Sequence, residues 1–61
     1  MRTLDFFAEY TTDTFNAINE VTNNFPCFVN WESVEMNFIE IAIIARQEDV
    51  ASIEKIFSKI V

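Results

Sequence analysis

The hydrophobic residues near the C-terminus predict a helix with one buried side. They recur at intervals of three and four residues, which is the period of an amphipathic helix. This stripe consists of Val50, Ile53, Ile56, Phe57, Ile60 and Val61. Glu48 and Asp49 stand at its start, and Lys55 and Lys59 near its end. Acids at the start and bases at the end match the helix dipole, so we predict a helix over about 48–60.

The middle of the chain predicts a β-hairpin. Two runs rich in β-branched and aromatic residues, 27–34 and 38–46, flank a short loop. A three-residue loop pairs Val34 with Phe38 and gathers the apolar residues on one face, whereas a two-residue loop mixes the two faces. The core face is then Cys27, Val29, Trp31 and Ser33 against Ile39, Ile41, Ile43 and Ala45. Asn37 ends this loop and tolerates the left-handed backbone conformation needed there.

The N-terminal segment fits two patterns. Apolar residues alternate along it as in a strand, at Leu4, Phe6, Ala8 and Tyr10. A helical spacing also runs from Leu4 to Phe25, so one long helix from Thr3 is the alternative. The run Thr-Thr-Asp-Thr at 11–14 decides between them, because such residues are poor inside a helix and good at its start. We therefore predict a strand over 3–10.

A helix follows that strand. We predict that it covers 12–24, with Thr11 or Thr12 as its N-cap, and that it ends before Pro26. The order of elements is then β-α-β-β-α, and the chain forms one α+β domain over 1–61. A right-handed crossover and direct pairing of the hairpin give a three-stranded antiparallel sheet with two helices on one face.

This order of elements resembles the ferredoxin-like fold without its last strand. The alternative is a long N-terminal helix followed by the hairpin and the C-terminal helix. In the ferredoxin-like fold the last strand pairs with the first, and the sequence reaches Val61 before such a strand. We therefore expect an open edge on strand 3–10, covered by a homodimer or by strand addition to another protein, since small domains often need such support. Asp5 and Glu9 could also protect the edge by charge alone.

The sheet face turned away from the helices is the predicted partner-binding surface. It keeps large apolar residues beside acids, where a solvated face would be polar. The candidate residues are Asp5, Phe7, Glu9, Phe28, Glu32, Val34, Phe38, Glu40 and Ile44. Alternatively, so small a domain has too few polar residues to cover its surface. Glu32 and Glu40 oppose each other across the strands, and we expect them to receive an arginine or lysine of a partner or to remain a solvated pair.

Composition removes most kinds of chemistry. The chain has no His, no Gly and a single Cys. Without His the commonest general base is missing, and without Gly the phosphate-binding glycine loops cannot form. Cys27 alone makes neither an intramolecular disulfide nor a zinc site, and it faces the predicted core, where a thiol is unreactive. We expect no enzymatic activity, no catalytic residue, no cofactor and no metal site.

The charge balance defines the class of partner. Ten acids oppose four bases, for a net charge of −6. Such acidity argues against direct nucleic-acid binding, and no apolar run approaches the roughly 20 residues of a membrane span. The lone Cys suggests a cytoplasmic setting, which is the host cytoplasm if the gene belongs to a phage.

We therefore predict a protein-binding module that inhibits or regulates a partner with a basic surface. By analogy of size and charge, it could be a phage-encoded, anti-CRISPR-like inhibitor that mimics nucleic acid. One alternative is an adaptor subunit that docks through its apolar sheet face. Another is a dimeric module like the ACT domains, which binds a small ligand, although such sites often use glycine loops.

Overall fold

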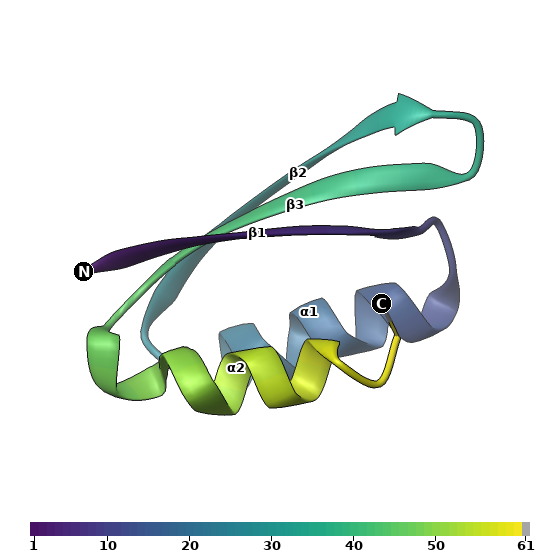
Figure 1. The fold of residues 1–61 in the computed structure, drawn as a ribbon. Helices are drawn as coiled ribbons and strands as arrows, with labels where there is room; N and C mark the ends of the chain where they lie inside the picture. Colours follow the sequence, from purple (N-terminus) through teal and green to yellow (C-terminus); the bar gives the residue numbers. More distant parts are fainter. Residues whose placement is uncertain (61) are drawn as a thin grey trace.

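A computed structural model describes residues 1–60 of the chain. The elements are β1 (Arg2–Glu9), α1 (Thr12–Asn24), β2 (Cys27–Glu35), β3 (Phe38–Ala45), the 3-10 turn η1 (Gln47–Asp49) and α2 (Val50–Phe57). The three strands form one antiparallel sheet with β3 between β1 and β2 (Figure 1). This confirms the predicted α+β class and the three-stranded antiparallel sheet. The alternative with a long N-terminal helix is wrong, because residues 2–9 pair with β3 along their whole length.

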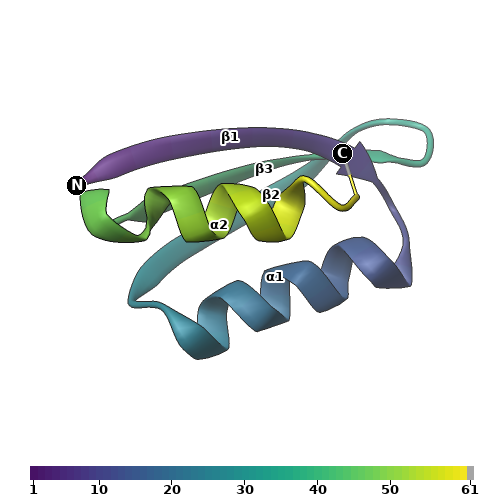
Figure 2. The same cartoon turned by 60° about the horizontal axis from the view of Figure 1, so that its bottom comes forward.

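The two helices lie side by side beneath the sheet (Figure 2). Helix α1 contacts β2, and α2 contacts β1. The Thr11 hydroxyl caps α1 by accepting a hydrogen bond from the Thr14 amide at 3.3 Å, as the polar run before the helix predicts. The helix ends where Phe25 turns extended ahead of Pro26. A proline directly after the helix fits this end, since it cannot continue the helical hydrogen bonds.

The hairpin keeps the predicted register except at its tip. Ser33 faces Ile39 as expected, but Glu35 rather than Val34 pairs with Phe38. The predicted Val34–Phe38 pair is therefore wrong, because the ladder shifts between Ser33 and Glu35 and leaves Val34 as an extra residue. The bulge lets a two-residue turn close the hairpin without exchanging the two faces. Asn37, in this turn, adopts the predicted left-handed conformation, with φ of 67°.

The C-terminal helix is shorter than predicted. Regular α-helix covers Val50–Phe57, and the 3-10 turn η1 precedes it. At the far end the Ile60 amide donates to the Phe57 carbonyl at 3.0 Å, a spacing of three residues that tightens the chain and ends the α-helix. Val61, part of the predicted apolar stripe, lies outside the described residues.

The core lies between the sheet and the helices. Its fully buried side chains come from β3 and from both helices and include Val21, Ile39, Ile41, Ile43, Ile53 and Phe57. The Phe57 ring stacks on Phe6 with centroids 4.5 Å apart, which joins α2 to β1. The odd-numbered residues of β3 are buried and the even-numbered ones are not, so the sheet has one dry face and one open face.

Trp31 is not part of the enclosed core that the sequence predicts. It packs edge to face against Phe15, at a centroid distance of 4.9 Å, and against Tyr10, but remains 44% exposed. Strand β2 is an edge strand, and the hairpin tip rises away from the helices (Figure 1). Trp31 and Ser33 therefore lie where the helices do not fully cover the sheet, and both are exposed.

Candidate functional site

The face of the sheet opposite the helices gathers the predicted partner-binding residues. We call it the outer face, and define it by Thr3, Asp5, Phe7, Glu9, Phe28, Asn30, Glu32, Phe38, Glu40, Ala42 and Ile44. Strand alternation and the shared register bring these residues together, since side chains two apart on a strand share a face. Val34, the remaining predicted residue, is exposed but lies at the bulge and has no partner on β3 in the register.

Large apolar side chains remain uncovered on the outer face. Phe28 is 71% exposed, Phe7 is 50% exposed and Ile44 is 40% exposed. Phe28 and Ile44 are cross-strand neighbours at one end of the face. Exposed apolar side chains that gather in this way mark contact sites more often than scattered ones do.

A pair of opposed carboxylates lies in the middle of the outer face. Glu32 and Glu40 are directly opposite each other on β2 and β3, as predicted. They line an open depression of about 350 Å³ together with Asn30, Trp31 and Ala42. The two carboxylates offer only hydrogen-bond acceptors, so chemically the depression suits a guanidinium or ammonium group. Asn30 and Ala42 were absent from the predicted partner-binding residues, although the same alternation along the strands places them here.

The charges on the outer face have one sign. Asp5, Glu9, Glu32 and Glu40 lie on it, while none of the four bases within residues 1–60 does. Arg2 and Arg46 lie at the end of the sheet next to Phe28 and Ile44, where the side chain of each bonds a polar group of η1 instead. Lys55 and Lys59 belong to α2 and the turn after it. The carboxylates of the outer face therefore have no neutralising partner within the described chain.

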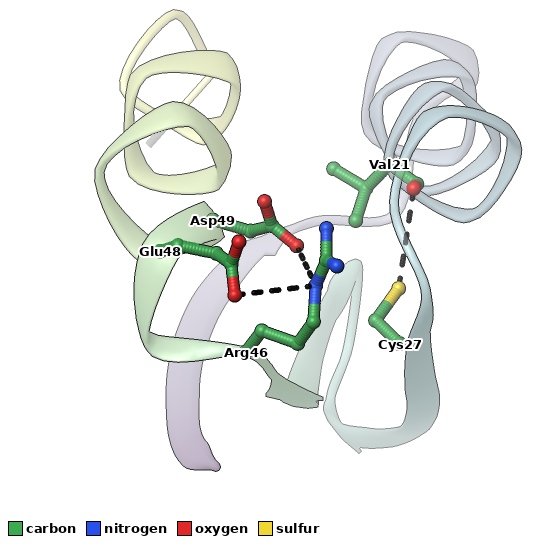
Figure 3. Close-up of polar contacts among 5 residues, drawn as sticks. All are labelled: Val21, Cys27, Arg46, Glu48 and Asp49. Atoms are coloured by element: carbon green, nitrogen blue, oxygen red, sulfur yellow. Dashed lines mark hydrogen bonds and ion pairs between the residues drawn. The ribbon is translucent and has the colours of Figure 1, made fainter.

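A polar cluster at the corner between β3 and α2 was not predicted. Arg46 Nε donates to Asp49 Oδ2 at 2.8 Å and lies 3.9 Å from Glu48 Oε1 (Figure 3). The hydrogen bond to Asp49 raises the pKa of the Arg46 guanidinium above its ordinary value. Asp49 is buried, so this hydrogen-bonded partner offsets part of the cost of burying its charge. The spacing of three residues between Arg46 and Asp49 could have indicated this pair. It was missed because Arg46 was predicted to lie in the strand, where residues three apart do not meet.

Cys27 lies beside this cluster. Its Sγ is 3.9 Å from the Val21 carbonyl oxygen, and the residue is half-buried rather than enclosed as predicted (Figure 3). Burial and, secondarily, the negative charge of Asp49 raise the pKa of the Cys27 thiol. The thiol is therefore protonated near neutral pH, and a protonated thiol is a poor nucleophile.

Other kinds of site find no support in the described residues. Within 1–60, no three His, Cys, Asp or Glu side chains gather as metal ligands would. None of the helices described for this chain has both the length and the apolar composition that crossing a bilayer requires. Comparisons with protein-family models, with curated protein sequences and with solved structures found no significant match.

Proposed function

We propose that the protein is a small non-enzymatic binding module that docks its outer face on a basic protein surface and thereby inhibits or regulates the partner. The separation of charge carries this proposal. Within residues 1–60, the outer face holds acids beside exposed aromatic rings and holds none of the bases. A face of one sign attracts a partner of the opposite sign and speeds their association.

The partner class that suits such a face is a nucleic-acid-binding protein. These proteins present Lys and Arg side chains along the path of the phosphates. A rigid acidic sheet can occupy that path by charge mimicry. The more specific form of the proposal is a phage-encoded, anti-CRISPR-like inhibitor of a host defence nuclease, acting in the host cytoplasm. Its support is analogy in size, acidity and lack of His and Gly.

We also assign the chain to a ferredoxin-like arrangement without its last strand and with both helices on one face. The order β1-β3-β2 and the two helices beneath the sheet support this assignment (Figure 2). In that arrangement a further strand would pair with β1, so the proposal treats β1 as an edge open to a partner.

The test measures binding to a basic nucleic-acid-binding protein, isolated from host cells by affinity capture, at about 50 mM and about 200 mM salt. We expect the affinity to fall by more than about tenfold between these two conditions. Replacing Glu32→Gln together with Glu40→Gln changes the net charge from −6 to −4 and weakens binding.

The matched control is Glu20→Gln with Glu54→Gln, which makes the same change of net charge on exposed helical residues. This control keeps the affinity close to that of the unaltered protein if the outer face is the contact surface. Equal weakening by both pairs means that net charge alone drives binding, and it contradicts the proposed face.

An adaptor that docks by apolar contact is the second candidate. The exposure of Phe28 at the end of the outer face favours it, because this ring has no counterpart to cover it within the described residues. Apolar docking survives high salt, whereas charge mimicry does not. The same pair of salt conditions therefore separates the two functions.

A further inference from the structure

One hydrogen bond reveals which backbone groups of β1 face the open edge. The Tyr10 amide donates to the Asn37 carbonyl oxygen at 2.7 Å, one position beyond the pair formed by Glu9 and Phe38. In an antiparallel ladder, residues alternate between pairs that exchange hydrogen bonds and pairs that do not. Ala8, and by the same period Phe6 and Leu4, therefore direct their backbone groups toward β3.

The intervening residues direct their backbone groups away from the sheet. The amides of Thr3, Asp5, Phe7 and Glu9 all face the open edge of β1. The Glu9 carbonyl is already bonded, since it accepts from the Thr11 amide at 2.9 Å. The side chains of these same four residues lie on the outer face and are exposed. The open edge and the acidic outer face are thus one continuous surface.

We propose that this edge takes up an extended segment of the basic partner as a fourth strand. The inference rests on the proposed function and names its mode of recognition. Residues two apart on the added strand face the same side, so three of them stand opposite Glu9, Phe7 and Asp5. The segment that fits carries a basic residue, an apolar residue and a second basic residue at alternate positions. The backbone supplies affinity, and the two carboxylates select the charge.

Charge disfavours a second copy of the chain at this edge. Two antiparallel copies of β1 that pair at least five of its eight residues place Asp5 opposite Thr3, Asp5, Phe7 or Glu9 of the other copy. Opposite Asp5 or Glu9, two acids meet directly. Opposite Thr3 or Phe7, Asp5 still lies diagonal to at least one acid of the other copy, about 7–8 Å away. Each copy also carries a net charge of −6, so the acids reject a like edge and accept a basic one.

The experiment follows the backbone amides of ¹⁵N-labelled protein during titration with the synthetic peptide Thr-Lys-Thr-Val-Thr-Lys-Thr. We expect the amide signals of Asp5, Phe7 and Glu9 to shift and their hydrogen exchange to slow by at least about tenfold, because each gains a hydrogen bond to the peptide. The exchange of Leu4, Phe6 and Ala8, already bonded to β3, changes little.

Two control peptides separate strand addition from simple charge attraction. One has the same composition with its lysines at adjacent positions, so that they face opposite sides of a strand. The other is N-methylated at the valine, which removes the donor opposite Phe7. Both should bind at least about tenfold more weakly. The first peptide can direct only one of its lysines toward a carboxylate of the edge, and the second loses an edge hydrogen bond and is blocked in its approach by the methyl group. Equal binding of the N-methylated peptide overturns the inference and leaves charge-driven docking intact.

Variants of the edge give an independent readout. Asp5→Pro and Asp5→Asn lose the same charge, but only proline removes the outward amide, and edge strands tolerate proline at such positions. Circular dichroism verifies that both fold. We expect Asp5→Pro to bind the peptide about tenfold more weakly than Asp5→Asn. Equal binding by the two variants, or an unliganded protein that is dimeric with slowly exchanging edge amides, overturns the inference. The proposed function is tested separately, because it predicts that Glu32→Gln with Glu40→Gln weakens binding to the partner whether or not β1 takes up a strand.

Discussion

The rings of Phe7 and Phe38 lie nearly parallel, at an angle of 8° and with centroids 5.3 Å apart, on the side of the sheet that no helix covers. They come from neighbouring strands and meet diagonally, because Phe7 is opposite Glu40 and Phe38 is opposite Glu9. Each ring therefore packs on the other and has a carboxylate opposite it. The outer face thus presents a stacked aromatic pair in an acidic setting, which suits a partner with both apolar and basic groups.

Phe28 contributes to the surface and little to the fold. We expect Phe28→Thr to change the free energy of unfolding by less than about 0.5 kcal/mol, because the ring is mostly exposed and threonine is also favoured in strands. Phe57→Ala, which empties a fully buried position, should cost about 3–5 kcal/mol. Urea denaturation followed by circular dichroism measures both. A large loss for Phe28→Thr would mean that this ring is part of the structural core.

The opposed pair Glu32 and Glu40 should lower the stability of the free protein. Like charges directly across two strands are unfavourable, so we expect Glu40→Gln to raise the free energy of unfolding by about 0.2–1 kcal/mol at low salt. The gain shrinks as salt screens the repulsion. Glu20→Gln, on the exposed side of α1, serves as the control with the same change of charge. A gain in stability together with a loss of affinity for the partner would show that the two carboxylates serve binding at the expense of stability.

Asn37 determines how easily the hairpin closes. Its φ of 67° lies in the left-handed region, which glycine enters without strain and a β-branched residue does not. Asn37→Gly should therefore leave the free energy of unfolding unchanged or raise it slightly. Asn37→Val should lower it by about 1–2 kcal/mol. Thermal unfolding of the two variants provides the comparison, and similar melting temperatures would contradict the turn geometry.

The stability of the protein should fall as alkaline pH ionises Cys27. Folding raises the thiol pKa, so the folded state holds this proton more tightly than the unfolded state does. That contribution is complete below the unfolded pKa and is lost as pH rises through the folded value, in the range above about 9. Unfolding free energies at pH 8 and pH 10 should therefore differ more in the unaltered protein than in Cys27→Val. An identical pH dependence in the two proteins would refute the effect.

The reactivity of the thiol tests the same feature in the folded state. Alkylation of Cys27 by iodoacetamide should be slow at neutral pH and accelerate on the alkaline side. Asp49→Asn removes the second cause of the raised pKa and should move this acceleration to lower pH. The variant requires an independent check of folding, because Asp49 also bonds Arg46.

Local sequence patterns were sufficient for much of the fold and for most of the candidate site. The polar run before α1 determines its N-cap at Thr11, and Asn37 provides the left-handed turn residue. The alternation along β3 assigns one face to the core and one to the outside. That alternation, together with the register, was enough to bring Glu32 opposite Glu40. These features depend on neighbours within a few residues or on one periodic pairing, so a single sequence contains them.

Tertiary structure decided the features that depend on what surrounds a residue. The bulge at Val34 arises because the turn and the ladder must be satisfied together, and the exposure of Trp31 arises because the hairpin tip passes beyond the helices. The Arg46–Asp49 pair forms because β3 ends at Ala45, one residue before the predicted end at Arg46. Periodicity in a sequence specifies the direction of a side chain, whereas its burial depends on which elements reach it, and that is a property of the folded chain alone.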